Sequence, residues 1–309
     1  MAIVIIRQDG KIPEWKEALS AASSHVPIYS YLEEHPKEAI DMALVWKHPP
    51  GTLRAYPNLK CISGSGAGVD FIFEDKEAPL HLPITRVVDQ VLAQDMSEHV
   101  IGVILAYLKN LYTYKVDQAN RTWKPLPYKR IEDYTVGILG MGALGIVLAK
   151  DLVRFGFKVQ GWSNSRKKVE TVKSFVGQGE LPDFLGTTQV LVCLLPLTQS
   201  TAGILNKALF QQLPKDAFVI NVARGGHLVD EDLLEMLDNG HLSGAGLDVY
   251  HKEPLPISHP FWEHPKIHMT PHYASVSDTR SVVPQILENY RRLRAGEPLL
   301  NLVSKERGY

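Results

Sequence analysis

Short runs rich in Val, Ile and Leu alternate with longer helix-compatible stretches from residue 135 onward. This alternation predicts repeated strand-helix-strand units and therefore a parallel sheet. The nearly continuous apolar run at 190–195 is typical of a strand that helices cover on both faces. The pattern predicts six parallel strands, at 135–139, 157–161, 189–195, 217–222, 244–250 and 266–270.

The first hundred residues show a weaker form of the same pattern, with expected strands at 2–6, 42–46, 60–63 and 84–87. A long helix is expected at about 92–117, with apolar residues on nearly every face of its middle, so that it must be buried on several sides, against both domains or a partner subunit. An irregular arm follows at 121–127. A last helix at about 281–295 is expected to return to the first domain.

Length, charge and cysteine content narrow the class of protein. At roughly 150 residues per domain, 309 residues indicate about two domains. The 33 basic and 34 acidic side chains give a net charge of −1, which argues against a nucleic-acid-binding surface. Cys61 and Cys193 lie in apolar runs, as buried thiols do in a reducing cytoplasm. The apolar runs at 2–6 and 100–108 are too short for a signal peptide or a membrane span, so no membrane partner is expected.

The strand at 135–139 runs into Gly140, Met141, Gly142, Ala143, Leu144 and Gly145, and a helical stretch follows. This G-x-G-x-x-G spacing between a strand and a helix is typical of a dinucleotide-binding Rossmann sheet. Gly140 permits the tight turn, Gly142 lets the backbone approach a pyrophosphate, and Gly145 lets the helix pack against the strand. We expect an α/β protein with a doubly wound parallel sheet in 96–281, including the long helix, and a smaller flavodoxin-like domain in 1–95 plus 282–309.

The end of the second strand of this sheet indicates which dinucleotide binds. A site that prefers NAD normally carries Asp or Glu there, about 20 residues after the glycine loop. Here the residues are Trp162, Ser163, Asn164, Ser165 and Arg166, without a carboxylate. Hydroxyls and a guanidinium bind a 2′-phosphate through charge-assisted hydrogen bonds, so NADPH is the expected cofactor. Preference for NADH is the alternative.

Three polar residues follow three strands of the larger domain: Arg224, Glu253 and His272. Ligands of open α/β sheets bind beyond the carboxyl ends of the strands, so the three side chains are expected to converge. Together they suit the reduction of a ketone next to a carboxylate. His272 donates the proton, Glu253 orients the imidazole and favours its charged form, and Arg224 holds the substrate carboxylate and polarises the carbonyl.

The smaller domain offers candidate substrate contacts. Its strand at 60–63 leads into a glycine-rich loop that contains Ser65, Gly66, Ala67 and Gly68, whose backbone N–H groups can form a small anion nest. Trp46 ends another strand and is a candidate wall of the pocket, although core packing explains it equally well. The three histidines at 259, 264 and 268 have loose spacing and no carboxylate cluster, so no metal site is expected.

These motifs resemble the D-isomer-specific 2-hydroxyacid dehydrogenase family and, within it, the bacterial A-type reductases of glyoxylate and hydroxypyruvate. The matching stretches are spread over nearly the whole chain. They lie at 43–46, 66–70, 136–145, 162–163, 221–225, 247–250, 253–256, 270–272 and 307–309. The Arg, Glu and His motifs together are highly specific to the family.

The resemblance implies that Arg224 binds substrate, that His272 is the acid/base, and that Glu253 is its partner. It also implies that the loop at 65–68 meets the substrate carboxylate and that Asp248 lies near the nicotinamide carboxamide. The protein implied is a cytoplasmic homodimer that reduces glyoxylate and hydroxypyruvate with NADPH. The remaining expected cofactor contacts are Leu195, Pro196, Val222 and Ala223.

Two positions depart from the A-type pattern. Asn164 stands where these reductases tend to have a further Arg, which weakens the expected phosphate site. Ser65 stands where a larger apolar residue is usual, so substrate preference can differ. The competing functions are an NADH-preferring dehydrogenase acting on another 2-keto acid, and a dinucleotide-sensing binding protein without catalytic activity.

Overall fold

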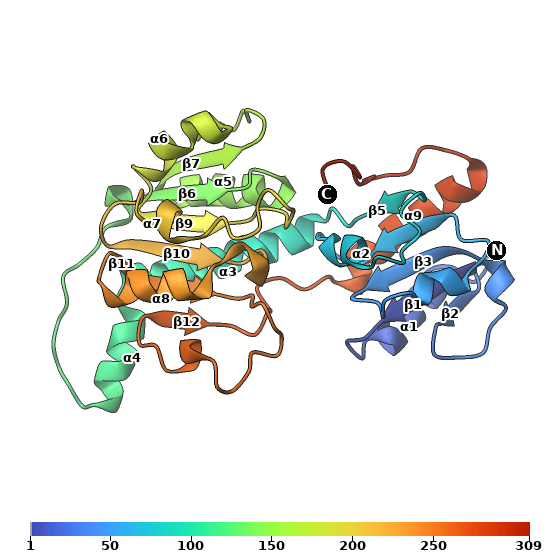
Figure 1. Cartoon of the computed structure of the whole chain (residues 1–309), viewed down its shortest axis with the longest axis horizontal. Coiled ribbons are helices and arrows are strands. Elements are labelled where there is room, and N and C mark those ends of the chain that lie inside the picture. The colour runs from blue at the N-terminus through green and yellow to red at the C-terminus, as the bar shows by residue number, and fades with distance from the viewer. Residues whose placement is uncertain (1) are drawn as a thin grey trace. The chain divides into compact units, whose positions relative to one another are not determined.

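The computed structural model describes residues 2–309, which form two compact units (Figure 1). The first unit contains the chain up to Val91 together with Ser277–Tyr309, and the second contains Leu92–Val276. The sequence analysis placed the two junctions a few residues later, at 95/96 and 281/282.

A five-stranded parallel sheet forms the first unit, in the order β2-β1-β3-β4-β5. This is the flavodoxin-like strand order. Successive residues of β1 alternate between two cores, one of them under helices α1 and α9 and the other under α2, so the strand is apolar throughout. The strands are β1 (Ala2–Arg7), β2 (Ile28–Ser30), β3 (Ile40–Trp46), β4 (Cys61–Gly64) and β5 (Ile84–Thr85), and the helices are α1 (Ile12–Ala22), α2 (Asp70–Glu74) and α9 (Thr279–Ala295).

A seven-stranded parallel sheet forms the second unit, in the order β12-β11-β10-β9-β6-β7-β8. The order reverses between β6 and β9, which is the switch point of a Rossmann sheet and the usual place for a dinucleotide. The strands are β6 (Thr135–Leu139), β7 (Lys158–Ser163), β8 (Lys173–Val176), β9 (Val190–Cys193), β10 (Ala217–Asn221), β11 (Leu242–Leu247) and β12 (Ile267–Met269). The predicted fold class is confirmed.

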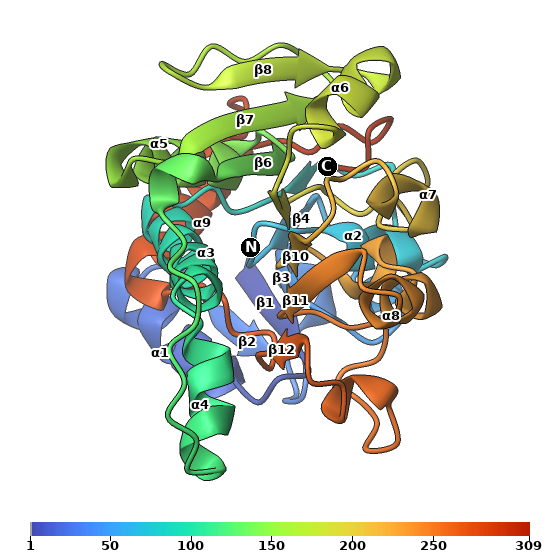
Figure 2. The same cartoon turned by 90° about the vertical axis from the view of Figure 1, so that its left-hand side faces the viewer.

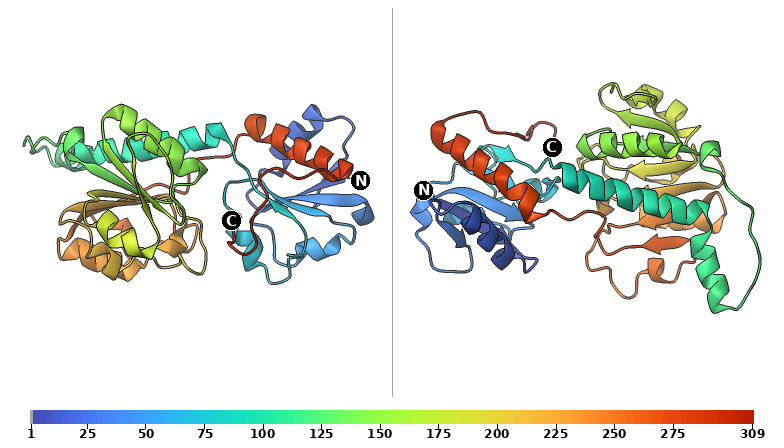
Figure 3. Two further views of the ribbon diagram at one scale, coloured as in Figure 1. Left: turned by 90° about the horizontal axis from the view of Figure 1, so that it is seen from above. Right: turned by 180° about the vertical axis from the view of Figure 1, so that it is seen from behind.

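Helices cover both faces of the second sheet. Helices α3 and α5 lie side by side on one face, and α6, α7 and α8 pack on the other (Figures 2 and 3). The bounds are α3 (Gln90–Leu108), α4 (Leu111–Ala119), α5 (Ala143–Phe155), α6 (Leu181–Leu185), α7 (Lys207–Phe210) and α8 (Asp230–Asp238). Short 3₁₀ turns are η1 (Lys37–Ala39), η2 (Thr52–Ala55), η3 (Ile131–Asp133), η4 (Gln178–Glu180), η5 (Gly225–His227) and η6 (Pro260–Trp262).

Two edge strands, β2 and β8, were not predicted. Within β8 only Phe175 is buried, and its neighbours are Lys, Ser and a half-exposed Val. A short edge strand needs no continuous apolar run, because one of its sides meets solvent. The prediction of six strands in the larger sheet is therefore wrong by one.

The predicted helix at 92–117 is two helices. Helix α3 ends at Leu108, and Asn110 adopts a left-handed backbone conformation (φ 57°), which an α-helix cannot continue. Helix α4 then leaves the body of the second unit and has no buried residue (Figure 2). The expected burial on several sides applies to α3 and not to α4.

Helix α3 has the length and apolar composition that a membrane span requires, with a mean hydropathy of 1.2. The continuous apolar run at 100–108 covers only the second half of this helix, so that run alone does not predict the length of the apolar segment. Val100, Ile104 and Leu108 on this helix are fully buried and share a core with β6, β9 and α5. Those contacts are typical of the core helix of a folded unit rather than of a membrane span.

Candidate active site

The glycine loop at 140–145 joins β6 to α5 at the switch point of the second sheet. Gly140 has a φ of 107°, and a side chain there would overlap the Leu194 carbonyl. A methyl on Gly145 would collide with the Gly140 carbonyl oxygen, so the start of α5 can approach β6 only through glycine. Met141 turns inward against Gly161 of β7 and is buried.

Gly142 differs from the other two glycines, because nothing lies within 4 Å of the place its side chain would take. It also caps the N-terminus of α5 without a side-chain hydrogen bond to the first-turn amides. An open backbone beside uncapped amides is what a pyrophosphate needs. The loop therefore fits a dinucleotide.

The end of β7 carries the residues predicted to recognise the ribose. Trp162 is buried and its Nε1 donates to the Gly177 carbonyl (2.8 Å). The Ser163 hydroxyl donates to the Ser165 carbonyl (2.8 Å), and Asn164 and Ser165 are exposed. Trp162 and Ser163 are the last residues of β7, two positions beyond the predicted end of this strand, and Asn164 and Ser165 lie in the loop that follows it.

Arg166 has partners that the sequence did not reveal. Its guanidinium donates to the Ser174 carbonyl of β8 (2.6 Å) and to the carboxylate of Glu180 (2.6 Å). The Val176 backbone N–H and the Arg166 guanidinium together hold the pKa of Glu180 below its ordinary value. The residues at 162–166 contain no carboxylate, but the segment after the edge strand β8 brings Glu180 to this loop.

The ends of β9 and β10 supply apolar surface close to the glycine loop. Leu195, Val222 and Ala223 are each at least nine-tenths buried, and the Leu194 N–H donates to the carbonyl of Leu139 at the end of β6 (2.8 Å). The Pro196 carbonyl accepts from the hydroxyl of Thr201 (2.6 Å). The predicted cofactor residues after β9 and β10 therefore lie on the β9 side of the switch point, beside the end of β6.

His272 and Glu253 form a hydrogen-bonded pair in the second unit. His272 Nδ1 lies 2.7 Å from Glu253 Oε2, and the side chains are 26% and 21% exposed. Since a carboxylate only accepts, Nδ1 carries the hydrogen, and Nε2 is left to exchange a proton with a ligand. The other carboxylate oxygen of Glu253 accepts from the Tyr250 N–H (3.1 Å). The pair predicted from the strand ends is thus formed.

Arg224 occupies the turn after β10. The buried Asn221 holds this turn, because its Nδ2 donates to the Arg224 carbonyl (2.9 Å) and its Oδ1 accepts from the Ala223 N–H (3.2 Å). A side chain on Gly225 would overlap the backbone of Tyr250. The Arg224 turn therefore packs directly against the segment that leads to Glu253. The Arg224 guanidinium donates to the Ala223 carbonyl (2.6 Å), and its convergence with the Glu253 and His272 side chains stays a prediction.

Asp248 anchors the loop that carries His272. Its carboxylate accepts from the Thr270 hydroxyl (2.6 Å), the Tyr273 N–H (2.9 Å) and the Ala274 N–H (3.0 Å). His272 lies between these residues with a left-handed backbone (φ 55°), which a non-glycine residue adopts only when its surroundings impose it. The contacts of Asp248 make it a positioning residue for His272. The position near the nicotinamide carboxamide that the resemblance implies for Asp248 stays a prediction, and Asn221 is not among the predicted site residues.

The first unit presents its glycine loop after β4. Ser65 is buried, and its N–H donates to the Val45 carbonyl (3.0 Å), whereas the N–H groups of Gly66, Ala67 and Gly68 donate to no other residue between positions 2 and 309. The Trp46 ring covers Gly66, so that a side chain on Gly66 would come within 2.5 Å of it. Unpaired amides under an aromatic ring suit a small anion.

Arg7 supports this loop and was not predicted. Its guanidinium is buried, pairs with Asp9 (2.6 Å), donates to the Ser65 hydroxyl (3.3 Å) and lies over the Trp15 ring. The sequence offered only an Arg at the end of a strand. A buried cation with a carboxylate partner holds Ser65 in place, so the nest begins at Gly66.

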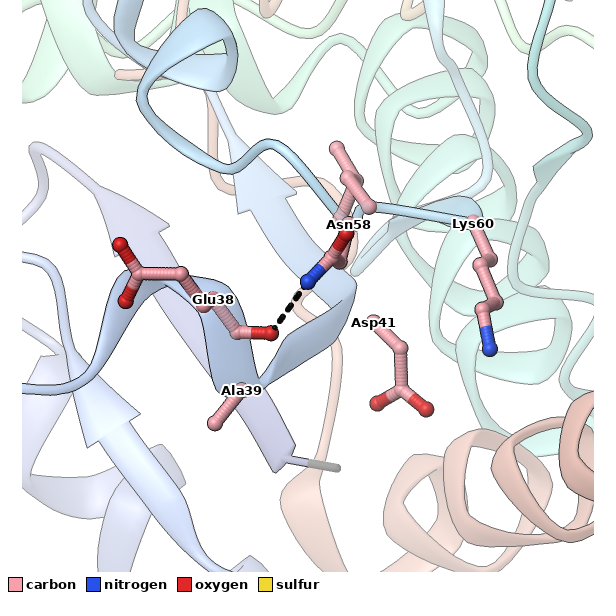
Figure 4. A pocket seen from close by; sticks show the side chains of 6 residues that line it. Glu38, Ala39, Asp41, Asn58 and Lys60 are labelled. Carbon is pink, nitrogen blue, oxygen red and sulfur yellow. Dashed lines mark hydrogen bonds between the residues drawn. The ribbon is translucent and has the colours of Figure 1, made fainter.

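A surface hollow in the first unit is separate from this loop (Figure 4). Its lining lies at the amino ends of β3 and β4, where the Asn58 amide donates to the Glu38 carbonyl (2.8 Å), and Trp46 and Ser65 lie beyond the carboxyl ends. The hollow therefore contains none of the predicted substrate residues. Across residues 2–309, no three His, Cys, Asp or Glu side chains gather as a metal would require.

A family model described as D-isomer specific 2-hydroxyacid dehydrogenase, NAD binding domain, matches residues 101–274. The chain belongs to this family. The chain is 39% identical over 303 residues to the glyoxylate/hydroxypyruvate reductase A of Yersinia enterocolitica. The aligned region covers 96% of this chain and 97% of the relative.

Two solved structures, one of a D-isomer specific 2-hydroxyacid dehydrogenase and one of a glyoxylate/hydroxypyruvate reductase, are similar to this chain over nearly its full length. The Xanthobacter autotrophicus enzyme, in complex with NADPH and MES, is 38% identical, with a TM-score of 0.94 and coverage of 100% of this chain and 99% of that one. The NADPH-dependent glyoxylate/hydroxypyruvate reductase of Sinorhizobium meliloti, in complex with NADP and sulfate, is 37% identical, with a TM-score of 0.93 and the same coverage.

Membership confirms the predicted family and the predicted class of enzyme, an NAD(P)-dependent 2-hydroxyacid dehydrogenase. In the second unit of this dehydrogenase, the glycine loop, the β7 loop and the three strand-end residues all follow strands at the carboxyl edge of one sheet. That they form a single site stays a prediction. The loop at 65–68 and Trp46 belong to the first unit, where they lie together at the carboxyl edge of its sheet.

Proposed function

We propose that this protein reduces small 2-keto acids with NADPH, converting glyoxylate to glycolate and hydroxypyruvate to D-glycerate. The observation that carries the proposal is the His272–Glu253 pair, anchored by Asp248, beside the turn that presents Arg224. The printed names of the relatives, which are reductases of glyoxylate and hydroxypyruvate, support the same substrates.

The residues of the second unit divide the chemistry between them. The bound reduced nicotinamide supplies a hydride to the carbonyl carbon of the substrate. His272 gives the proton on Nε2 to the carbonyl oxygen, so that one hydride and one proton convert the ketone to an alcohol. Glu253 holds Nδ1–H and stabilises the charged imidazolium that precedes the transfer.

Arg224 binds the substrate carboxylate in this proposal. Its planar guanidinium matches a carboxylate in two parallel hydrogen bonds, which orients the keto group before reaction. In the first unit, the unpaired amides of the loop at 66–68 suit a small anion, and Trp46 limits the space above Gly66. A small 2-keto acid carries the charge and the size that these residues accept.

NADPH is proposed as the preferred cofactor on the residues of the β7 loop. Changing Ser163→Asp places a carboxylate beside the ribose, where it repels a 2′-phosphate and accepts from a 2′-hydroxyl. We expect the NADPH/NADH ratio of kcat/KM to fall by about tenfold. An unaltered ratio in this variant would show that cofactor discrimination lies elsewhere.

The assay that tests the function follows the loss of nicotinamide absorbance with glyoxylate, hydroxypyruvate and pyruvate in turn, each with NADPH and with NADH. Turnover of glyoxylate or hydroxypyruvate that is faster with NADPH supports the proposal. Faster turnover with NADH favours the NADH-preferring alternative. The Glu180 carboxylate, which binds Arg166 in the loop after β7, also supports that alternative. Absence of turnover with all three acids contradicts the proposed activity.

We further propose that the protein is a cytoplasmic homodimer. Helix α4 and the arm after it expose large apolar side chains, namely Leu111, Tyr114, Val116, Trp123 and Tyr128, and Trp123 is 97% exposed. Apolar surface of this kind is typical of an interface between subunits. Both cysteines are free and buried, as in a reducing compartment. Sedimentation at the mass of a monomer would contradict the dimer, and recovery outside the cytoplasmic fraction would contradict the location.

A further inference from the structure

The end of β7 and the loop after it, called the ribose loop (162–166), are hydrogen-bonded to the segment that follows β8. The Trp162 indole donates to the Gly177 carbonyl, and the Gly177 N–H donates to the Ser163 carbonyl (3.3 Å). Glu180, in η4, lies three residues after Gly177 and accepts from the Val176 N–H (2.8 Å). The ribose loop and Glu180 are therefore parts of one hydrogen-bonded assembly, although 14 residues separate Arg166 from Glu180.

Both terminal nitrogens of Arg166 already donate hydrogen bonds within the protein. One terminal nitrogen donates to the Glu180 carboxylate and the other to the Ser174 carbonyl, both at 2.6 Å. Both side chains of the ion pair are open to solvent, at 58% and 40% exposure. A phosphate that approaches this loop meets a guanidinium whose charge is already compensated, and it meets a second negative group as well.

Rearrangement of the pair is physically accessible, because exposed ion pairs are weak and long side chains change rotamer easily. A 2′-phosphate that binds Arg166 must compete with Glu180 for the same N–H groups. A ribose that carries only a 2′-hydroxyl has no charge to be repelled and makes no such demand. The carboxylate thus penalises NADPH and leaves NADH nearly unaffected.

We propose that Glu180 is a specificity-determining residue that lowers the preference of this enzyme for NADPH by holding Arg166. The inference rests on the proposed function for its cofactor, but it concerns a residue outside the glycine loop and outside the ribose loop. Asn164 makes the effect larger, because it is neutral and leaves Arg166 as the one positive residue among the predicted cofactor contacts at 162–166.

The test is a titration of the purified full-length protein with NADPH and with NADH, following protein fluorescence without any keto acid. In Glu180→Gln we expect the Kd for NADPH to fall by about two- to fivefold and the Kd for NADH to stay the same. The amide oxygen of Gln still accepts from Val176, so the β8 segment is retained. Arg166→Gln should raise the Kd for NADPH, and the benefit of Glu180→Gln should vanish in the double variant.

Asp183→Asn provides the matched control. Asp183 is exposed, lies three residues beyond Glu180, and its carboxylate has no hydrogen bond or ion pair within residues 2–309. The Asp183→Asn substitution removes one negative charge from the same region without releasing Arg166. The affinity for NADPH should therefore change less in Asp183→Asn than in Glu180→Gln. Equal gains in the two variants would assign the effect to net charge and overturn the proposal.

Two further outcomes overturn it. A parallel change in the affinities for NADPH and NADH would make Glu180 a structural support of the loop, and unchanged affinities would show that Arg166 does not meet the phosphate. The titration needs no keto acid, so it tests the role of Glu180 separately from the proposed reaction. If the protein shows the predicted affinities but no turnover, the role of Glu180 is supported and the proposed reaction is contradicted. A wild-type chain that binds neither dinucleotide would refute both.

Discussion

The His48–Asp75 pair of the first unit and the His272–Glu253 pair of the second join the same kinds of side chain, yet they serve different ends. In the first pair His48 Nε2 lies 3.1 Å from Asp75, and the side chains are 0% and 3% exposed. In the second, Nδ1 of a partly exposed His272 binds the carboxylate. A carboxylate partner alone therefore does not distinguish the proposed catalytic histidine from a buried structural one.

The free ring nitrogen and its surroundings decide the role. His48 Nδ1 is buried and has no hydrogen-bond partner among residues 2–309. Burial lowers the pKa of His48, which opposes protonation, although Asp75 acts in the other direction. Asp75 also accepts from Gly51 and Glu77, so this pair stabilises the loop after β3. His272 is partly exposed to solvent and lies in a loop that Asp248 anchors, which fits the proton donor proposed above.

The largest expected effect separates the two histidines directly. His272→Gln should lower kcat by about 10² to 10⁴, because it removes the proton donor. The Kd for the cofactor should change little. His48→Gln is the matched control: it should lower the free energy of unfolding by about 1 to 3 kcal/mol, since a buried carboxylate loses a partner, with kcat retained. Steady-state kinetics and denaturant unfolding measure both, and a wild-type rate in His272→Gln would remove His272 from the mechanism.

The glycine loop of the second unit offers a sharper comparison within one motif. Gly142→Ala has room for its methyl in the protein, so the melting temperature should hold while the Kd for both dinucleotides rises by about tenfold or more. Gly145→Ala instead forces α5 away from Gly140 and should lower the melting temperature. Fluorescence titration and calorimetry distinguish the two. Tight binding by Gly142→Ala would show that the pyrophosphate lies elsewhere.

The corresponding change in the first unit is Gly66→Ala. The added methyl lies 2.5 Å from the Trp46 ring, which must move. If this loop binds the substrate carboxylate, the KM for the keto acid should rise by about fivefold to tenfold, while the Kd for NADPH stays the same. Gly10 has no neighbour within 4 Å but a left-handed backbone (φ 76°), so Gly10→Ala reports the cost of backbone strain at a surface turn of the same unit without a collision. An unchanged KM in Gly66→Ala would exclude the loop from substrate binding.

The smallest expected effect is on the free energy of unfolding at acidic pH. His268 stacks on Tyr112 (3.5 Å between ring centres), and burial lowers its pKa to about 4 from an ordinary value of 6.5. The folded state then binds fewer protons than the unfolded chain, so stability is lost as the pH falls from 6.5 to about 4. The loss should be about 1 kcal/mol, discounted because the ring is partly exposed to solvent. His268→Phe should flatten the unfolding free energy over this range, and an identical slope in the variant would contradict the assignment.

The His48–Asp75 pair sharpens the same experiment. Because the pKa of His48 is also lowered, its neutral form stabilises the first unit above pH 6.5, and acid removes that contribution. His48 and His268 lie in different units, so their effects on the pH dependence should add.

Much of the second unit follows from the sequence by itself. Alternating apolar runs mark β6, β9 and β10 because buried parallel strands have no polar face. The glycine spacing marks the start of α5, and the carboxyl-edge rule selects Arg224, Glu253 and His272, because every strand of a parallel sheet delivers its last residue to the same edge. These predictions need only local pattern and strand direction.

Only the tertiary structure decided the contacts between segments that carry no apolar signal. Pairing of the edge strand β8 brings Glu180 to Arg166, and the left-handed Asn110 divides a helix that the apolar pattern runs together. Asp248 acquires its role only when the backbone of 270–274 wraps around its carboxylate. The physical reason is the same in each case: a short edge strand, a single backbone angle or a polar contact over a long separation is stabilised by its neighbours in space and leaves no periodic trace along the chain.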